Sequence, residues 1–476
     1  MAEVAPGTFD ELRRPDEARL RSRGATPGMT HELCANGPLW PGDKEGGLRV
    51  LLTGATGLIG RAVLAGLTGE GHAVVAVARS AGSAVRLPDA ARCIALDIAK
   101  ATSPADWLPH LTGIDAVVNC AGVLQDSPRD STAGVHSDGA AALFAACEQA
   151  GVRRIVQVSA IGVDRGGATA FARSKLAGDQ TLMARDLEWV ILRPSVVVGR
   201  QAYGGSALFR GLAALPVMPR LAGTKPLQVV QLDDLVRTIL FFLKPDPPTR
   251  IALEIAGPER LSLDDVLIAY RRWLGHGDAR FVTVPRWLAL VAFRLGDLIG
   301  LLGWRPPLRS TTRLELMRGG AGDPAPWTRV TGIAPRSLEA ALAAEPASVQ
   351  ERWFARLYFA KPLTMGVLAL YWIVTGLVAL GPGWEDATGL IQEAGFAIAA
   401  PLAAASAIAD IAIGVAIAAK PTARPALRAA LALSLAYVAL GTLLLPGLWA
   451  DPLGPLLKVL PIMVLNLVAL AILDDR

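Results

Sequence analysis

The chain has 476 residues, 52% of them hydrophobic, and its mean hydropathy of +0.40 is high for a soluble protein. The formal net charge is +5, but the arginines are scattered, so the charge does not indicate a nucleic-acid partner. The four cysteines show neither a CxxC pair nor metal-ligand spacing, which favours buried, reduced thiols and predicts no metal site.

The first segment, residues 1–45, is polar and shows no hydrophobic period. It mixes Arg, Asp, Pro and Gly, a composition that cannot bury a core. We therefore predict a disordered leader, or a segment that stems from a misassigned start. No apolar stretch follows Met1, so no signal peptide is expected.

Short apolar runs alternate with helical patterns from residue 48 onward. The strand-like runs are 49–52, 73–78, 93–98, 116–120, 154–159 and 190–198. The helical patterns between them cover 61–69, 105–111, 133–150 and 171–185. Strands that alternate with helices form a parallel sheet with helices on both faces. We therefore predict an α/β Rossmann-type doubly wound parallel sheet. A small C-terminal lobe should follow it, with helices at 233–243 and 263–274.

Residues 281–304 form an apolar stretch that is interrupted by three charges, Arg286, Arg294 and Asp297. Each charge near the centre of a transmembrane helix costs roughly 2.5–3.5 kcal/mol. The stretch is therefore predicted to contain a core or interfacial helix rather than a membrane span.

Four long apolar segments follow, at about 363–380, 394–419, 425–445 and 456–473. Each is close to the length of about 20 residues that a helix needs to cross the hydrocarbon core of a bilayer. We therefore predict a four-helix transmembrane bundle over 362–476, preceded by a juxtamembrane helix at 346–361. The alternative is a buried helical bundle of a soluble protein.

One acid, Asp410, lies deep inside the second apolar segment. A carboxylate at that depth needs a partner or a water pocket, and Asn466 is a candidate partner. Asp410 therefore indicates either a proton or quinone site or a structural hydrogen bond between helices.

The loops between the apolar segments differ in charge. The first loop carries three acids and no Lys or Arg, whereas the second carries Lys420, Arg424 and Arg428. Basic loops stay on the cytoplasmic side of a membrane. The chain is therefore expected to be a multi-pass protein of the cytoplasmic (inner) membrane, with the α/β domain and both termini facing the cytoplasm.

The sharpest motif runs from Thr53 to Gly60, with glycines spaced GxxGxxG between a strand and a helix. Gly54 permits a tight turn, Gly57 lets the backbone approach a pyrophosphate, and Gly60 allows the helix to pack closely on the strand. The N–H groups at the start of the helix then face the phosphates. Strand, loop, helix and second strand occur in register, so the motif predicts a dinucleotide site.

The second strand ends at Ala78-Arg79-Ser80, where an NAD site usually has an acid that binds the ribose 2′-hydroxyl. Arg79 could pair with a 2′-phosphate, and Ser80 adds a hydroxyl beside it. NADP(H) is therefore favoured over NAD(H), and the alternative is an exposed arginine at a strand end. Asp97, after the third strand, could accept a hydrogen bond from the adenine amine.

Several motifs together resemble a known family. They are the glycine-rich loop at 53–60, the turn Asn119-Cys120-Ala121-Gly122, Ser159 with Lys175, and the segment 192–199. Over roughly residues 48–340 they are similar to atypical short-chain dehydrogenases/reductases, most of all to the branch that includes the NADPH-binding accessory subunit of respiratory complex I. Residues 46–345 are accordingly expected to form an NAD(P)-binding domain. The four-span tail resembles a DoxX-like membrane domain, in span number and composition.

The resemblance implies roles for these residues. The turn at 119–122 would hold the adenosine side of the cofactor, Lys175 would hydrogen-bond the nicotinamide ribose, and Ser159 would polarise a substrate carbonyl. The structural alternatives are a turn cap for Ser159 and a solvated helix lysine for Lys175. The residues expected to be catalytic are Ser159 and Lys175. The residues expected to bind the cofactor are Thr53, Gly54, Thr56, Gly57, Leu58, Ile59, Gly60, Arg79, Ser80, Asp97, Ile98, Asn119, Ala121, Gly122, Lys175, Arg193 and Pro194.

One position departs from the family pattern. The catalytic tyrosine that the family places four residues before the lysine is Phe171 in this chain. Phenylalanine has no proton to give to a developing alkoxide, a step that a positioned acid accelerates about 10²–10⁴-fold. The resemblance therefore predicts cofactor binding more strongly than turnover.

Two functions follow from these features. The first is a membrane-anchored NAD(P)H-binding oxidoreductase that acts on a quinone-like or lipid-soluble substrate. The alternative is a non-catalytic NADPH-binding module that has a structural or redox-sensing role in a membrane assembly, and Phe171 is its main support. A nucleotide-sugar epimerase or dehydratase is a weaker third interpretation, because those reactions also rely on the missing tyrosine.

Overall fold

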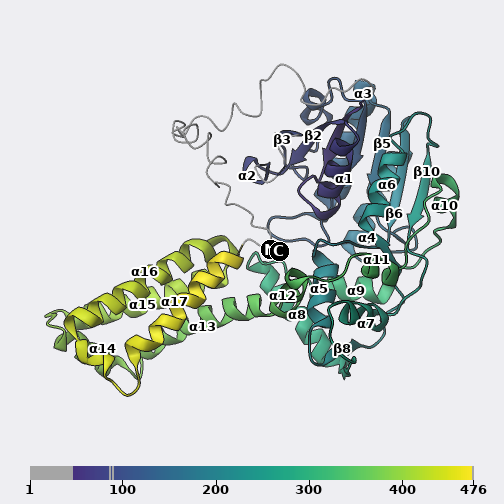
Figure 1. The fold of residues 1–476 in the computed structure, drawn as a ribbon. Coiled ribbons are helices and arrows are strands. Elements are labelled where there is room, and N and C mark those ends of the chain that lie inside the picture. Colours follow the sequence, from purple (N-terminus) through teal and green to yellow (C-terminus); the bar gives the residue numbers. More distant parts are fainter. Residues whose placement is uncertain (1–46, 85–86, 88–90, 474–476) are drawn as a thin grey trace, which may run out of the picture.

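The computed structural model describes residues 47–84, 87 and 91–473, so the predicted leader lies outside the described residues. Figure 1 shows an α/β part built around a sheet and a bundle of long helices that extends away from it. The chain passes from the first part to the second at helix α13 (Ala360–Leu380).

The α/β part is organised around a seven-stranded sheet in the order β10-β6-β5-β4-β1-β2-β3, and every neighbouring pair is parallel. Its strands are β1 (Arg49–Thr53), β2 (Ala73–Ala78), β3 (Ala91–Ala95), β4 (Ala116–Asn119), β5 (Arg154–Val158), β6 (Glu188–Pro194) and β10 (Ile251–Ile255). The strand order reverses between β1 and β4. Open parallel sheets bind ligands at the carboxyl ends of the strands beside such a reversal.

Helices cover both faces of this sheet. They are α1 (Leu58–Gly69) and α6 (Leu232–Phe241) on one face, and α3 (Gly139–Ala150) and α4 (Ala170–Met183) on the other. Leu52 of β1 lies in one buried cluster with Leu64 of α1, whereas Leu51 lies in another with Phe144 of α3. Successive side chains of a strand point to opposite faces, so β1 contributes to both cores. The predicted doubly wound fold is confirmed.

The run 190–198 forms two strands, although one was predicted. β6 ends at Pro194, and β7 (Val196–Val198) leaves the main sheet to pair with β9 (Val229–Gln231). Ser195 lies at the break, where its N–H donates to Ile255 O at 2.9 Å and its hydroxyl donates to Gly320 O at 2.5 Å. Both acceptors come later in the chain, so no local pattern indicated the break.

Three shorter elements also differ from the prediction. β3 ends at Ala95 instead of 98, and the segment 133–150 begins with a π-helical turn at Gly134–Asp138. The segment 105–111 forms two 3₁₀ turns, Pro104–Asp106 and Leu108–His110, in place of one helix. Each of these turns has a proline in its first positions, and proline interrupts the hydrogen bonds of a continuous helix.

The elements after β7 form most of the smaller lobe. They are α5 (Gly204–Ala213), β8 (Met218–Leu221), α7 (Leu263–Trp273), β11 (Phe281–Val284), α8 (Arg286–Leu301), α9 (Ser310–Arg318), α11 (Leu338–Ala344) and α12 (Val349–Leu357). Helix α10 (Ala325–Thr331) returns to the sheet, where Trp327 is buried. The lobe has a core of its own, which includes Phe209, Leu267 and Tyr270. The stretch 281–304 thus begins as a strand and continues as α8.

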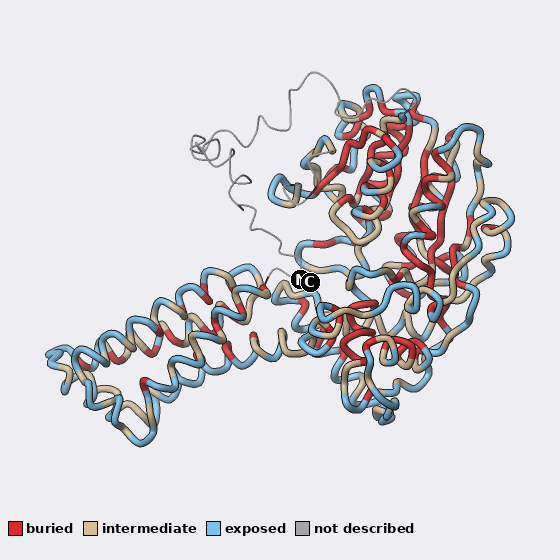
Figure 2. The backbone as a smooth tube through the Cα atoms, viewed as in Figure 1, coloured by how far each residue is buried: buried red, intermediate tan, exposed pale blue. Residues whose placement is uncertain are grey.

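Four helices of the described chain are long and apolar enough to cross a membrane. They are α13, α15 (Ala399–Ala418), α16 (Lys420–Leu444) and α17 (Pro455–Ile472), with mean hydropathies between 1.8 and 2.2. Only 17–28% of their apolar windows is buried inside the protein, so most apolar side chains face outward (Figure 2). That exposure fits a lipid surrounding rather than the interior of a soluble bundle. A short helix not expected from the sequence, α14 (Trp384–Glu393), lies in the first loop.

The buried acid of this bundle has a partner other than the one predicted. The Tyr437 hydroxyl donates to Asp410 Oδ1 at 3.1 Å, and the Ser406 hydroxyl lies 2.6 Å from Tyr437 Oη. Asn466 donates instead to Ile462 O in its own helix, at 3.0 Å. The hydrogen bond from Tyr437 to Asp410 therefore joins α15 to α16.

Candidate active site

The predicted site residues gather along the carboxyl edge of the sheet. Thr53, Asn119, Arg193 and Pro194 end strands, and Arg79, Asp97 and Ser159 follow strand ends within two residues. Lys175 reaches this edge from α4. Parallel strands present all their carboxyl ends at one edge, so the sheet topology collects residues that are more than a hundred positions apart in sequence.

The glycine-rich loop joins β1 to α1 at this edge. Gly54 has a φ of +67°, and a Cβ atom there would lie 2.6 Å from Cys120 O. A Cβ atom at Gly60 would lie 2.1 Å from Gly54 O. Glycine is therefore required at Gly54 for the turn and for its approach to the end of β4, and at Gly60 for the packing of α1 on the loop.

The start of α1 leaves backbone N–H groups available to a ligand. No side chain of the described residues caps this helix at Gly57, and its first turn has no acid. A Cβ atom at Gly57 would meet only Gly54 O, at 3.3 Å. The neighbouring Thr56, Leu58 and Ile59 are half-buried. An uncapped helix N-terminus behind a glycine loop fits the pyrophosphate of a dinucleotide.

The end of β2 carries a half-exposed guanidinium. Arg79 Nη2 lies 2.8 Å from Asp130 Oδ1, and Arg79 Nε lies 4.0 Å from Asp97 Oδ1. Ser80 donates its N–H to Ser83 Oγ at 3.0 Å, at the start of α2 (Ala81–Ala84). Ile98 follows Asp97 and packs directly against α3. Arg79 and Asp97 are therefore neighbours at the predicted adenosine end.

Asp130 links this end to the smaller lobe. Its carboxylate lies 2.5 Å from Arg305 Nη2 as well as being paired with Arg79. Burial acts to raise the pKa of Asp130, but the two arginines outweigh burial and hold the pKa below its usual range. A permanent negative charge therefore stands beside Arg79.

The turn after β4 is held by its own asparagine. The buried Asn119 donates to Gln157 Oε1 at 2.7 Å and accepts from the Ala121 N–H at 3.2 Å. The Thr53 hydroxyl also hydrogen-bonds Asn119 Oδ1. The side chain of Asn119 thus fixes the turn, and it is the backbone from Ala121 to Gly122 that lines this edge.

Lys175 is buried beside the same turn. Its Nζ donates to Val158 O at 2.9 Å and to Ala121 O at 3.3 Å, and a Cβ atom at Gly122 would lie 3.5 Å from it. Burial lowers the pKa of Lys175 to about 8, although the charge of Asp179 acts to raise it. The amine is therefore a group that can gain or lose a proton near neutral pH.

The hydroxyl of Ser159 is committed to a buried acid. Ser159 Oγ donates to Asp179 Oδ2 at 2.9 Å, and Arg193 Nε donates to the same oxygen at 3.2 Å. Burial raises the pKa of Asp179, while the bonds to Ser159 and Arg193 act to lower it. Arg193 also pairs with Asp164. In this arrangement Ser159 donates a hydrogen bond to Asp179. The resemblance implied that it would instead donate a hydrogen bond to a substrate carbonyl.

Phe171, at the position of the family's tyrosine, packs against a histidine. Its ring meets His136 edge-on, with centroids 5.6 Å apart. His136 Nε2 accepts from the Val123 N–H at 3.0 Å, and its Nδ1 lies 2.9 Å from Ser174 Oγ. Burial lowers the pKa of His136 to about 2, with the charge of Lys175 acting in the same direction. The imidazole is therefore neutral and is held in place by two hydrogen bonds.

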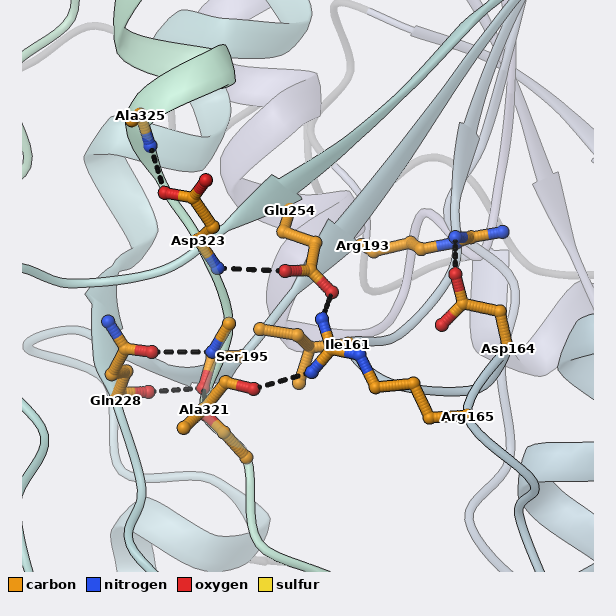
Figure 3. Close-up of polar contacts among 12 residues, drawn as sticks. Ile161, Asp164, Arg165, Arg193, Ser195, Gln228, Glu254, Ala321, Asp323 and Ala325 are labelled. Atoms are coloured by element: carbon orange, nitrogen blue, oxygen red, sulfur yellow. Dashed lines mark hydrogen bonds and ion pairs between the residues drawn. The ribbon is translucent and has the colours of Figure 1, made fainter.

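Residues 319–325, called the strap, lie at the β10 end of the carboxyl edge of the sheet (Figure 3). Arg165 bridges it to the sheet, since it pairs with Glu254 of β10 and also donates to a carbonyl of the strap at 2.8 Å. The N–H of Asp323 donates to Glu254 Oε2 at 2.8 Å. In Figure 3 the strap lies beside Glu254 and Ser195, and Arg193 with Asp164 lies on the far side of Glu254. The strap thus contacts the sheet at β10, the edge strand that is separated from β1 by three strands.

Two buried members of this site were not identified from the sequence. Asp179 stands four positions after Lys175, a spacing that places both on one helical face and could have been noticed. His136 lies 35 positions before Phe171 in sequence. The fold alone brings these two rings together, so no local pattern could have indicated their contact.

Two family models match the chain. Residues 54–210 match the NAD(P)H-binding family, and residues 369–467 match the DoxX-like family. This chain joins an NAD(P)H-binding domain to a DoxX-like domain. The resemblance to an atypical short-chain dehydrogenase/reductase fused to a DoxX-like domain is thereby confirmed at the level of the two domains.

The curated relatives match less than half of this chain. An uncharacterized protein of Mycobacterium tuberculosis is 32% identical over 209 residues, which are 43% of this chain and 22% of that protein. The ceramide reductase of Caulobacter vibrioides is 26% identical over 199 residues, which are 41% of this chain and 61% of the reductase. The chain thus spans about a fifth of the first relative and less than two thirds of the second.

Solved structures are similar in fold to part of this chain. MoeE5 in complex with UDP-glucuronic acid and NAD is 22% identical, with a TM-score of 0.48, and the match covers 62% of this chain and 96% of MoeE5. The Bordetella bronchiseptica enzyme WbmG in complex with NAD is 16% identical, with a TM-score of 0.47, over 67% of this chain and 96% of WbmG.

Proposed function

We propose that this protein is a membrane-anchored, NADPH-dependent oxidoreductase that reduces the carbonyl of a lipid-soluble or quinone-like substrate. The observation that carries the proposal is the buried amine of Lys175, which reaches the turn after β4 beside the glycine-rich loop. Burying a lysine amine costs free energy of folding, so the position of Lys175 is more readily explained by a reaction or a ligand than by stability.

The residues at the carboxyl edge suit a dinucleotide. The uncapped start of α1 and the close approach at Gly54 would hold the pyrophosphate, and the turn from Ala121 to Gly122 would lie along the cofactor. Lys175 would hold the nicotinamide ribose. When bound, NADPH would supply a hydride to the substrate.

The preference for NADPH rests on Arg79. Its half-exposed guanidinium stands where an NAD-specific site usually has an acid, and its pairing with Asp130 holds it in place. Because Asp130 neutralises part of the positive charge of Arg79, less of that charge is available to a 2′-phosphate. We therefore expect the protein to bind NADPH more tightly than NADH, but not to exclude NADH.

A lipid-soluble substrate is supported by two observations. The chain carries a DoxX-like domain and four helices that are long and apolar enough to cross a membrane, and such an anchor would serve an enzyme whose substrate is dissolved in the bilayer. The ceramide reductase of Caulobacter vibrioides, by its name, acts on a lipid, and it matches 41% of this chain. A lipid carbonyl is therefore the first substrate class to examine, and quinones are the second.

The proton for the new hydroxyl has to come from a group other than Phe171. Lys175 is our candidate, because the resemblance assigns its amine to the nicotinamide ribose and its pKa is about 8. Asp179 stands one helical turn away and is held by Ser159 and Arg193, and its negative charge would favour the ammonium form of Lys175. Lys175 would regain its proton from solvent after the product leaves. Ser159 then has a positioning role in this network.

A second candidate function is a non-catalytic NADPH-binding module. It is favoured by Phe171, whose ring fills the place of the usual acid and packs against the neutral His136. In this alternative the bound dinucleotide would stabilise the domain or report redox state to the membrane bundle.

The experiment that tests the proposal uses the full chain in lipid nanodiscs. Any bound nucleotide is released and identified, and NADPH oxidation is followed by its absorbance with long-chain ketones, a ketone derivative of ceramide, and quinones. We expect substrate-dependent oxidation in the wild type and its loss in Lys175→Met. The matched control is Lys244→Met, which removes an exposed lysine after α6.

The two candidate functions give different outcomes. NADPH that stays bound, is oxidised by no member of the panel, and turns over only after Phe171→Tyr would favour the non-catalytic module. Turnover by the wild type that Lys175→Met leaves unchanged would retain the oxidoreductase and reject Lys175 as its acid.

A further inference from the structure

Helix α8 exposes a broad apolar face in the smaller lobe. Trp287, Val291, Leu295, Leu298 and Leu302 recur every three or four positions, so they form one stripe along the helix, and each is 45–67% exposed. A soluble protein rarely leaves such a continuous apolar stripe in water. We therefore expect another surface, protein or lipid, to cover this stripe.

The opposite face of α8 is fixed to the lobe. Phe293, Gly296 and Gly300 are buried there, and a Cβ atom at Gly296 would lie 1.7 Å from Leu308 O. The helix cannot rotate to hide its exposed stripe without losing this packing. Its orientation, with the stripe outward, is therefore a fixed property of the fold.

The charges around the stripe are positive. Arg286 and Arg294 are exposed on α8, and the only acid of the helix, Asp297, is engaged by Arg309 at 3.3 Å and by the Ser310 hydroxyl at 2.5 Å. An apolar stripe edged by arginines is the composition of a helix that lies in the interface of a membrane with anionic lipids.

The end of α8 is bonded to the turn between two membrane-spanning helices. Trp304 Nε1 donates to Ala418 O at 2.7 Å, and the Lys420 N–H donates to Leu302 O at 2.9 Å. The Lys420 Nζ also lies 4.9 Å from the centroid of the Trp304 ring. Ala418 ends α15 and Lys420 begins α16, so these bonds place the end of α8 at the level where the spans leave the hydrocarbon core.

Helix α12 presents a second stripe before the first span. Val349, Trp353 and Leu357 lie at successive turns of this helix and are 54–65% exposed. Its acid, Glu351, is buried and bound to Ser348. Because α13 begins three residues after Leu357, this stripe also lies at the surface of the predicted bilayer. Figure 1 shows α8 and α12 at the junction of the two parts.

We infer that α8 and α12 form a membrane platform: their apolar stripes lie in the leaflet nearest the NAD(P)H-binding domain, and Arg294 contacts lipid phosphates. The bilayer is the occupant that these contacts favour, because both stripes adjoin the ends of the four spans. A long basic side chain within such a stripe can reach the headgroups while its stem stays in the apolar region.

The test measures the depth of single labelled positions in the full chain. An environment-sensitive fluorophore is attached to Leu298→Cys and to Trp353→Cys, and the protein is reconstituted in vesicles of phosphatidylcholine and phosphatidylglycerol. The control is Met183→Cys, an exposed apolar position at the end of α4, on the opposite edge of the sheet. The labelled parent chain gives the background from its native cysteines.

We expect labels at 298 and 353 to emit at shorter wavelength, to be quenched by nitroxide lipids and to be protected from aqueous iodide, unlike the label at 183. Arg294→Glu should reduce the lipid quenching at 298. Iodide quenching equal to that of the control would overturn the platform. Protection that appears only when several copies share a vesicle would also overturn it, in favour of contact with a second copy.

Discussion

Phe171 and Lys175 stand one helical turn apart on α4, and they determine which group at this site can donate a proton. The ring of Phe171 offers no proton and packs on the neutral His136. The amine of Lys175 is buried, with two carbonyl acceptors and the carboxylate of Asp179 nearby. The one ionisable group in this pair is therefore the lysine, and its protonation state should control any proton transfer at the site.

The first prediction concerns the pH dependence of turnover. A lysine acts as an acid only in its ammonium form, and burial holds the pKa of Lys175 at about 8. Turnover at saturating NADPH should therefore fall as the pH rises through about 8. The measurement is kcat across neutral and alkaline pH, with cofactor binding followed over the same range as the control. A flat profile through pH 8 would mean that another group delivers the proton.

The second prediction concerns cofactor choice. Replacing Arg79 with Gln removes the charge at the end of β2, and a hydrogen bond to a charged group contributes about 1.5–3 kcal/mol. NADPH affinity should fall roughly 10–100-fold while NADH affinity stays nearly unchanged. Both dissociation constants can be measured by titration of the detergent-purified protein. Arg153→Gln, at the opposite edge of the sheet, is the control, and equal losses for both nucleotides would reject the role of Arg79.

At the scale of elements, the glycine-rich loop and α1 give a third prediction. In Gly60→Ala the new methyl group would lie 2.1 Å from a backbone oxygen, so α1 must move. Overpacking of this kind costs about 1–3 kcal/mol, and the loop should no longer retain the cofactor. Gly69→Ala, in the last turn of the same helix, meets nothing within 4 Å and should stabilise by about 0.4–1 kcal/mol. Thermal unfolding and nucleotide retention measure both variants.

The elements that the sequence predicted well are those with a strong local signal. Buried strands such as β2 and apolar helices such as α13 are continuous apolar runs, and the length of each run indicates its type. The break at Ser195 was missed because it depends on acceptors 33 or more positions away. The partner of Asp410 was assigned to Asn466 by type and depth, whereas the packing of α15 on α16 selects Tyr437.

In the candidate site, the sequence indicated which residues lie at the carboxyl edge of the sheet, but not the hydrogen bonds and ion pairs between them. The glycine loop could be recognised from its spacing, and Lys175 from the resemblance to a known family. The bond from Ser159 to Asp179 and the pairing of Arg79 with Asp130 could not, because they join segments separated by 20 and 51 positions whose contact depends on the finished fold.

At the scale of the whole molecule, the charge of the loops predicts the orientation in the membrane. The loop that contains α14 has no Lys or Arg, whereas the turn at Lys420 is basic and contacts the smaller lobe. A fluorescent protein fused after residue 476 should fold and fluoresce in a bacterial host, and alkaline phosphatase inserted in the loop at 381–383 should be active. The reverse pattern would place the NAD(P)H-binding domain outside the cytoplasm.

The attachment at Trp304 has a kinetic consequence. Because the smaller lobe is hydrogen-bonded to the turn between α15 and α16, we expect the carboxyl edge of the sheet to stay close to the membrane surface instead of moving on a long tether. A substrate dissolved in the leaflet would then reach it by two-dimensional diffusion. The rate would follow the mole fraction of substrate in the membrane and not its amount per volume, so adding inert lipid at constant substrate would slow turnover by surface dilution.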